Sequence, residues 1–247
     1  LHAWCADFLV AILILHVIRV FCYAGYKRPR ELTWLFGSAL LVCVMAMGLT
    51  GYLLPWTQLS YWATTVVTEI GTAPPVVGPW SVRFLRGGET VTGMTLGRFF
   101  VLHVMILPAT IAGLVALHLY LVRRLGISTL VDADKEEKRG HERIVAAAGT
   151  RFWPDHLLIE LRVELVVLAL LVTCAVLWPR EIGPRADPFG PTPLGIKPEW
   201  YFLPLYQAMK YFTIDVGPID KRLIAFTVVN GALAAFLLLP LWDRTPG

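Results

Sequence analysis

The sequence predicts an all-α transmembrane protein, a helical bundle of about five spans with interfacial helices in its long loops. Of its 247 residues, 56% are hydrophobic and only 16% are charged, whereas soluble domains carry about a quarter charged residues. The apolar residues are also gathered into blocks. Each block is long enough for the roughly 20 helical residues that cross a hydrocarbon layer of about 30 Å. Helices are expected because a helix satisfies its own backbone hydrogen bonds in lipid.

The five apolar blocks, in chain order, are residues 3–23, 35–54, 99–122, 161–178 and 223–242. Two long connections, residues 55–97 and 179–221, are rich in glycine, proline and aromatic residues. Within the first of them, residues 61–70 are expected to form a short helix at the membrane boundary, where aromatic side chains are favoured. Because consecutive spans alternate in direction, both long connections lie at one membrane face, and a site is expected there.

The chain is predicted to consist of two modules, residues 1–130 and 155–247, joined by a charged connecting loop at residues 131–154. A net charge of +4 without a long basic tract gives no indication of a nucleic-acid partner. The four cysteines form no CxxC or CxxCH motif, so neither a disulfide framework nor an attached c-type haem is indicated. The first residue already lies inside a span, and we expect a first helix to precede it.

Four of the six histidines lie in apolar blocks: His2 and His16 are 14 residues apart, and His103 and His118 are 15 apart. Each pair is separated by roughly 21–23 Å along its helix, with both members on one side. The first and third spans run in the same direction, so His2 can face His103 and His16 can face His118. Two facing imidazoles in a helical bundle suit a haem with two axial ligands. The sequence thus predicts a dihaem bundle; the alternative is unrelated histidines that make interhelical hydrogen bonds.

The span between the histidine helices carries Gly37 and Gly51, which are also 14 residues apart. Glycine lets a flat macrocycle approach the backbone, so both are candidate cofactor contacts; small-residue helix packing is the alternative. Arg19, one turn after His16, can pair with a haem propionate or simply reach toward the boundary. Asp7 lies inside a span, where a carboxylate is costly, and is a candidate for a proton path or a boundary residue.

Several segments match one family closely. These are HAWCADFLVAILILHVIRV, KRPRELTWLFG, GYLLPWTQLSYWATTVVTEI, GRFFVLHVMILP and ADPFGPTPLGIKPEWYFLPLYQ, the last containing PEWY at residues 198–201. Over nearly its whole length the chain resembles cytochrome b of quinol-oxidising bc complexes. The 15-residue histidine spacing followed by RRLGIS is more similar to the chloroplast and cyanobacterial branch. FWPDHLL and ADPF are similar to the separate small subunit of that branch, here fused into one chain.

The resemblance implies roles for individual residues. His2 and His103 would bind the haem iron nearer the quinol-oxidising face, and His16 and His118 the haem iron nearer the opposite face. Arg98 and Arg123 match positions close to the haems or the second quinone site. The quinol pocket would lie between residues 61–70 and the PEWY motif, with Tyr61, Ala63, Pro198 and Trp200 lining it and with Glu199 and Tyr201 as catalytic residues. Glu199, a carboxylate in an aromatic loop, would accept a quinol proton.

The resemblance also implies an enzyme and its partners. The chain would be the cytochrome b subunit of a proton-translocating quinol–cytochrome c (or similar carrier) reductase, with two b-type haems. It would pass electrons from quinol to a second quinone site, beside which an additional haem is left open. The implied partners are a Rieske iron–sulfur protein, a c-type cytochrome subunit, quinone, membrane lipids and a second copy of the complex. The implied location is a bacterial inner or photosynthetic membrane.

Two other functions remain open from the residues alone. A dihaem b membrane anchor could link quinone to a peripheral dehydrogenase, because such an anchor needs the histidines but not the two elaborate connections. A haem-free transport or structural bundle would use the histidines only for hydrogen bonding. The identity of the quinone and of the final electron acceptor is not specified by the sequence.

Overall fold

The structure of the protein is a computed structural model that describes residues 1–126, 151–212, 215 and 220–245. Within these residues it is helical and contains no strand, only an isolated bridge between Thr57 and Arg185. Three helices are long and apolar enough to cross a membrane: His2–Cys22, Glu31–Leu53 and Gly93–Leu125. Helices α8 (Leu157–Leu177) and α10 (Lys221–Leu237) cover the other two expected blocks. The predicted all-α transmembrane fold is confirmed, and most of the predicted loop at residues 131–154 lies outside the described residues.

The chain divides into two compact units, of which the first contains α1 (His2–Cys22) and α8. Trp4 and Arg180 join the two helices. The Trp4 indole Nε1 donates to the carbonyl of Trp178 at 2.9 Å, and the Arg180 guanidinium carbon lies 4.9 Å from the centroid of the Trp4 ring. Arg180 also forms an ion pair with Asp7. Asp7 therefore has a cationic partner at the end of α8, as a carboxylate in an apolar helix requires.

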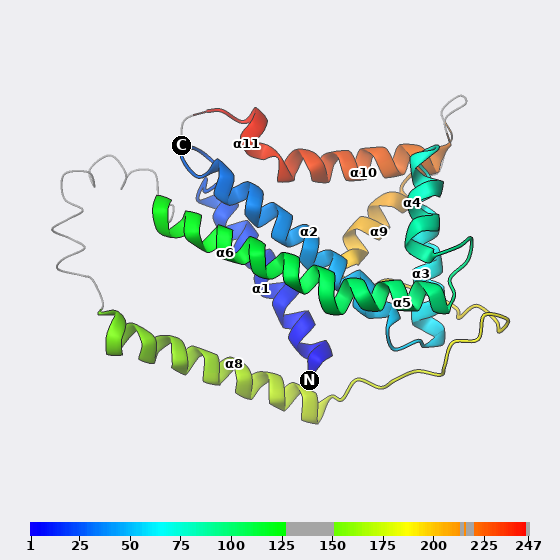
Figure 1. Ribbon diagram of the computed structural model, residues 1–247, viewed down its shortest axis with the longest axis horizontal. Helices are drawn as coiled ribbons and strands as arrows, with labels where there is room; N and C mark the ends of the chain where they lie inside the picture. Colours follow the sequence, from blue (N-terminus) through cyan, green and yellow to red (C-terminus); the bar gives the residue numbers. More distant parts are fainter. Residues whose placement is uncertain (127–150, 213–214, 216–219, 246–247) are drawn as a thin grey trace. The chain divides into compact units, whose positions relative to one another are not determined.

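The second unit carries the remaining helices. Figure 1 shows α3 and α4 lying across one end of α2, α5 and α10. The elements are α2 (Glu31–Leu53), α3 (Gln58–Ile70), α4 (Val77–Arg86), α5 (Gly93–Val101), the π turn η1 (Leu102–Ile106), α6 (Leu107–Leu125), the 3-10 turn η3 (Trp200–Phe202), α9 (Leu203–Lys210), α10 and α11 (Leu239–Trp242). The short helix expected within residues 61–70 is thus observed as α3, which begins three residues earlier.

Local sequence signals fix the ends of the crosswise helices. α3 begins with a capping box in which Thr57 and Ser60 exchange side-chain and backbone hydrogen bonds, and α5 begins with the same arrangement of Thr92 and Thr95. Such boxes satisfy amide groups that have no partner inside the helix. α4 ends at Gly87, whose φ of 78° is a conformation that only glycine adopts at little cost.

A small core holds the crosswise helices against the spans. Leu53, Tyr61, Val91 and Phe99 are buried together, so that the end of α2, the start of α3 and the start of α5 share one apolar contact. The Tyr61 ring packs edge-on against Trp56, with ring centroids 5.8 Å apart. This core fixes where α3 leaves α2.

Arg86 holds α3 from the side of α4. Its side chain is 6% exposed, and it donates to Thr68 Oγ1 at 2.8 Å, to the Thr65 carbonyl at 3.0 Å and to the Glu89 carbonyl at 2.8 Å. Its guanidinium also lies 3.3 Å from a carboxylate oxygen of Glu69. A buried cation is tolerated when it is paired and hydrogen-bonded in this way. The last turns of α3 are thereby fixed against α4.

Candidate functional site

The predicted glycines of α2 lie directly opposite the histidines of the third span. A Cβ built on Gly51 would lie 2.6 Å from Cε1 of His103, and one built on Gly37 would lie 3.1 Å from Cε1 of His118. Any larger residue at either position would push on an imidazole. The equal spacing of glycines and histidines therefore reflects direct packing of two imidazoles at two depths of the second unit, and it leaves a narrow space beside each ring such as a flat group needs.

Thr50 orients the His103 ring. The Thr50 hydroxyl donates to the Ala46 carbonyl at 2.8 Å, and its oxygen lies 3.2 Å from His103 Nδ1. Because the hydroxyl proton is directed to Ala46, the oxygen accepts the Nδ1–H of His103. This network assigns the ring proton to Nδ1 and the lone pair to Nε2. Ligand histidines are commonly oriented through a hydrogen bond from their second nitrogen, and Thr50 is a residue that the sequence patterns did not indicate.

The π turn η1 explains the unequal histidine spacing. The Leu107 amide donates to the Leu102 carbonyl, an i→i+5 bond that encloses one more residue than an α-helical turn. The extra residue lies between His103 and His118. A 15-residue interval that contains one π turn presents its ends much as a 14-residue α-helical interval does, which matches the 14-residue spacing of the glycines opposite.

The other two predicted ligands, His2 and His16, lie on α1 in the first unit. Their pairing with the histidines of the second unit stays a prediction. Arg19 lies on the same helix, with its guanidinium carbon 5.8 Å from the Tyr23 ring centroid. Arg98 donates to the Phe84 carbonyl and lies over the Phe84 ring, and Arg123 lies in the last turn of α6.

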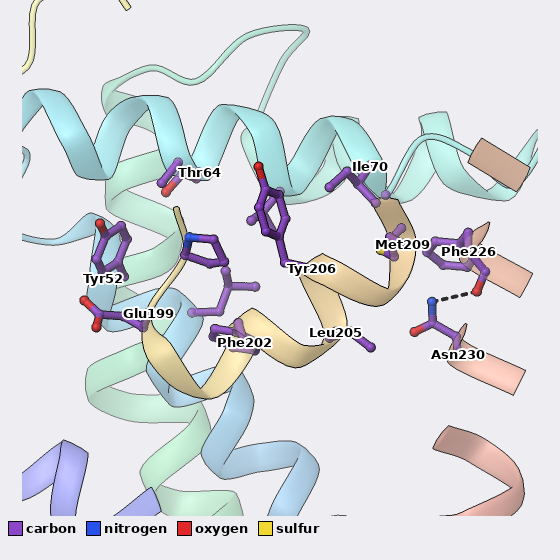
Figure 2. Close-up of a pocket in the computed structure, with 15 residues that line it drawn as sticks. Tyr52, Thr64, Ile70, Glu199, Phe202, Leu205, Tyr206, Met209, Phe226 and Asn230 are labelled. Atoms are coloured by element: carbon purple, nitrogen blue, oxygen red, sulfur yellow. Dashed lines mark hydrogen bonds between the residues drawn. The ribbon is translucent and has the colours of Figure 1, made fainter. Parts of the chain in front are cut away.

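A pocket of about 260 Å³ lies in the second unit between α2, α3, α9 and α10, and we call it the α3–α9 pocket. Three predicted pocket residues line it, Ala63, Pro198 and Glu199. Figure 2 shows Glu199, Tyr52 and Thr64 toward one end, and Phe226 and Asn230 toward the other. The remaining lining residues are Leu49, Val67, Ile70, Gly71, Phe202, Leu205, Tyr206 and Met209. Apolar walls with a few polar groups at one end are typical of sites for small, largely apolar ligands.

Gln58 brings the two halves of this pocket together. Its side-chain amide donates to the carbonyls of Asp187 and Pro191 at 3.1 and 3.3 Å, and its amide oxygen accepts from the Asp187 backbone at 2.6 Å. The backbone nitrogen of Gln58 also donates to the Pro184 carbonyl at 2.8 Å. These bonds attach the second long connection to the start of α3, so the two connections predicted to share a face do meet.

Two family models match the chain. One, described as cytochrome b(N-terminal)/b6/petB, matches residues 7–184, and the other, described as cytochrome b(C-terminal)/b6/petD, matches residues 185–247. The chain belongs to the cytochrome b family. Both parts lie on one chain, which confirms the predicted fusion of a cytochrome b6-type module with the module of the small following subunit.

Individual relatives agree with this membership. The chain is 39% identical over 245 residues to a cytochrome bc complex cytochrome b subunit of Chlorobaculum thiosulfatiphilum, covering 99% of this chain and 54% of the relative. It is 49% identical over 127 residues to cytochrome b6 of Prochlorococcus marinus strain MIT 9211, covering 51% and 58%. A solved chain of a hyperthermophilic respiratory complex III superposes with a TM-score of 0.79 at 33% identity, covering 98% and 62%. The chain thus spans little more than half the length of the curated relatives.

Not all predicted pocket residues of this cytochrome b chain line the α3–α9 pocket. Tyr61 is buried in the core beside Trp56 and Trp62, and Trp200 is not among the lining residues. Tyr201 packs on α2, because a Cβ on Gly48 would lie 2.7 Å from the Tyr201 hydroxyl. Gly48 therefore lets Tyr201, and with it the PEWY segment, lie against the second span.

Several lining residues escaped the sequence patterns. Tyr52 and Thr64 lie beside predicted residues, yet neither belongs to a motif. Asn230 is a polar residue in an apolar helix, and its amide donates to the Phe226 carbonyl at 2.8 Å. A polar side chain in an apolar span is by itself a reason to suspect a site, and this signal could have identified Asn230.

Proposed function

We propose that this chain is the cytochrome b subunit of a bc-type complex and that it oxidises a quinol in the α3–α9 pocket. The observation that carries this proposal is the joint lining of one pocket by the α3 segment and by Pro198 and Glu199 of the PEWY motif. A membrane anchor for a peripheral dehydrogenase has no need of such a pocket. The apolar walls suit a quinol ring and its tail, since both can leave lipid without losing hydrogen bonds.

Glu199 accepts a proton when the quinol is oxidised. Its carboxylate lies at the same end of the pocket as Tyr52, with Thr64 nearby (Figure 2). The apolar lining limits access of water, so a proton leaves the ring through a side chain held at that end. A positioned carboxylate of this kind typically contributes about 10²–10⁴-fold to a rate.

Two haems fit the histidine positions of this chain. His103 and His118 would each hold one iron through Nε2, with His2 and His16 as the opposite ligands. The glycine packing described above supports this fit, because Gly51 and Gly37 leave space beside each imidazole. When bound, the haems supply one-electron transfer across the membrane to a second quinone. Arg19, Arg98 and Arg123 are the basic residues proposed to lie near the propionates or the second quinone.

The partners follow from the electron count. A quinol releases two electrons and two protons, and the histidine sites serve one electron. The other electron needs an acceptor outside this chain, which we propose to be a Rieske iron–sulfur protein that reduces a c-type cytochrome or a similar carrier. The complex would lie in a bacterial inner or photosynthetic membrane.

Replacing Glu199→Gln in the assembled complex tests this function. We expect quinol oxidation to fall by about 10²-fold or more while both b-type signals in the reduced-minus-oxidised spectrum are kept. Glu181→Gln is the control, since Glu181 is an exposed carboxylate outside the pocket. Unchanged oxidation with both haems present would favour the membrane anchor. Absence of any b-type signal in the unmodified protein would favour the haem-free bundle.

A further inference from the structure

Thr64 presents a buried hydroxyl group to the α3–α9 pocket. The residue is 1% exposed and lines the pocket. Its Oγ1 atom is buried and has no hydrogen-bond partner among the residues that the structure describes. Buried polar side chains nearly always have a partner, so this hydroxyl requires an explanation.

The neighbouring threonines of α3 show what Thr64 lacks. Thr65 Oγ1 donates to the Tyr61 carbonyl at 2.9 Å, and Thr68 Oγ1 donates to the Thr64 carbonyl at 2.7 Å. Both are the usual bonds from a helical threonine to the carbonyl four residues earlier. The same helix thus satisfies two hydroxyl groups internally and leaves the one in the pocket lining unsatisfied.

The surroundings of Thr64 indicate which group completes its bonding. It lies toward the same end of the pocket as Tyr52 and Glu199 (Figure 2), whereas its neighbours in the lining on α3, Ala63 and Val67, are apolar. A ligand oxygen held near Glu199 lies toward the end at which Thr64 is found. A hydroxyl group both donates and accepts, so Thr64 can bond a quinone carbonyl as well as a quinol hydroxyl.

We propose that the Thr64 hydroxyl hydrogen-bonds a ring oxygen of the quinone or quinol in the α3–α9 pocket and so contributes to substrate binding and specificity. The identity of the ligand rests on the proposed function; the unsatisfied hydroxyl does not. Thr64 is a binding residue here, and Glu199 remains the proton acceptor. A ring that lacks an oxygen at this position leaves the hydroxyl unpaired and is discriminated against.

Thr64→Val in the assembled complex tests this proposal, because valine keeps the shape of threonine and removes only the hydroxyl. With a short-chain 1,4-benzoquinol as substrate, we expect KM to rise about tenfold, as loss of one buried hydrogen bond implies. We expect kcat to change less than twofold and both b-type haem signals to stay. Thr64→Ser restores the hydroxyl and should return KM toward the original value. Thr65→Val is the matched control and should leave KM unchanged, since its hydroxyl is bonded within α3.

Thermal unfolding supplies a second measurement that does not depend on turnover. Without quinone, Thr64→Val should be at least as stable as the unmodified protein, whereas Thr65→Val should be less stable because it loses an existing bond. The added stability produced by excess short-chain 1,4-benzoquinone should be smaller in Thr64→Val. An unchanged KM, or a loss of stability equal to that of Thr65→Val, overturns the proposal. If Glu199→Gln abolishes oxidation while Thr64→Val keeps KM, only the role of Thr64 fails; if neither affects oxidation, the proposed function fails.

Discussion

Gly51 offers a graded test of the histidine sites. Replacing Gly51→Ala adds a Cβ at 2.6 Å from Cε1 of His103, against the 3.4 Å at which ordinary contact begins. The difference, 3.4 minus 2.6 or about 0.8 Å, must be taken up by the imidazole or by α2. Functional side chains need to be held within about 0.5 Å of their working positions. The change therefore displaces His103 beyond that tolerance.

Gly37→Ala and Gly113→Ala complete the series. At Gly37 the added Cβ lies 3.1 Å from His118 Cε1, so the shortfall is 3.4 minus 3.1, about 0.3 Å, which is within tolerance. At Gly113 the added Cβ meets no heavy atom within 4 Å among the described residues. Gly113→Ala is the control, because it makes the same chemical change in an apolar helix and improves helix propensity.

The assay is the amount of each b-type haem per protein, read from reduced-minus-oxidised spectra of the purified complex. Overpacking typically costs about 1–3 kcal/mol, and about 1.4 kcal/mol corresponds to tenfold in an equilibrium constant. We expect Gly51→Ala to weaken retention of the haem at His103 by roughly 5- to 150-fold on that scale. Gly37→Ala should have a smaller effect and Gly113→Ala none. Full retention of both haems in Gly51→Ala, or an equal loss in Gly113→Ala, would refute the assigned packing.

Two other residues give predictions of stability. Arg86→Leu removes the buried hydrogen bonds that fix α3 and should lower the free energy of unfolding by about 3 kcal/mol, measured by denaturant unfolding; Arg83→Leu, at a side chain 65% exposed, should cost far less, and equal effects would contradict the role given to Arg86. Asp7→Asn breaks the ion pair with Arg180, which is 52% exposed, and should cost at most about 1 kcal/mol, an effect that salt reduces. If instead Asp7→Asn slows quinol oxidation at unchanged stability, Asp7 belongs to a proton path.

The helices and their approximate ends were predictable because each depends on nearby residues. Long apolar blocks gave the spans, and the aromatic segment after the second span gave α3. The spacing of Gly37 and Gly51 predicted positions opposite His118 and His103, since helical periodicity relates sequence distance to depth. The π turn at residues 102–106 was not predictable in this way, because it departs from that periodicity. Tyr61 shows the same limit: its motif suggested the pocket, yet its ring fills the core beside Trp56.

What the sequence by itself determined is therefore the set of helices, the depths of the histidines along them and the family. All three depend on hydrophobicity, helical rise and short motifs, which are properties of neighbouring residues. Only the tertiary structure decided which side chains share the α3–α9 pocket. Gln58 bonds to residues about 130 positions away, with a separation of 129 to Asp187, and no local pattern encodes such a contact. The unsatisfied hydroxyl of Thr64 likewise exists only because packing closes every other route to a partner.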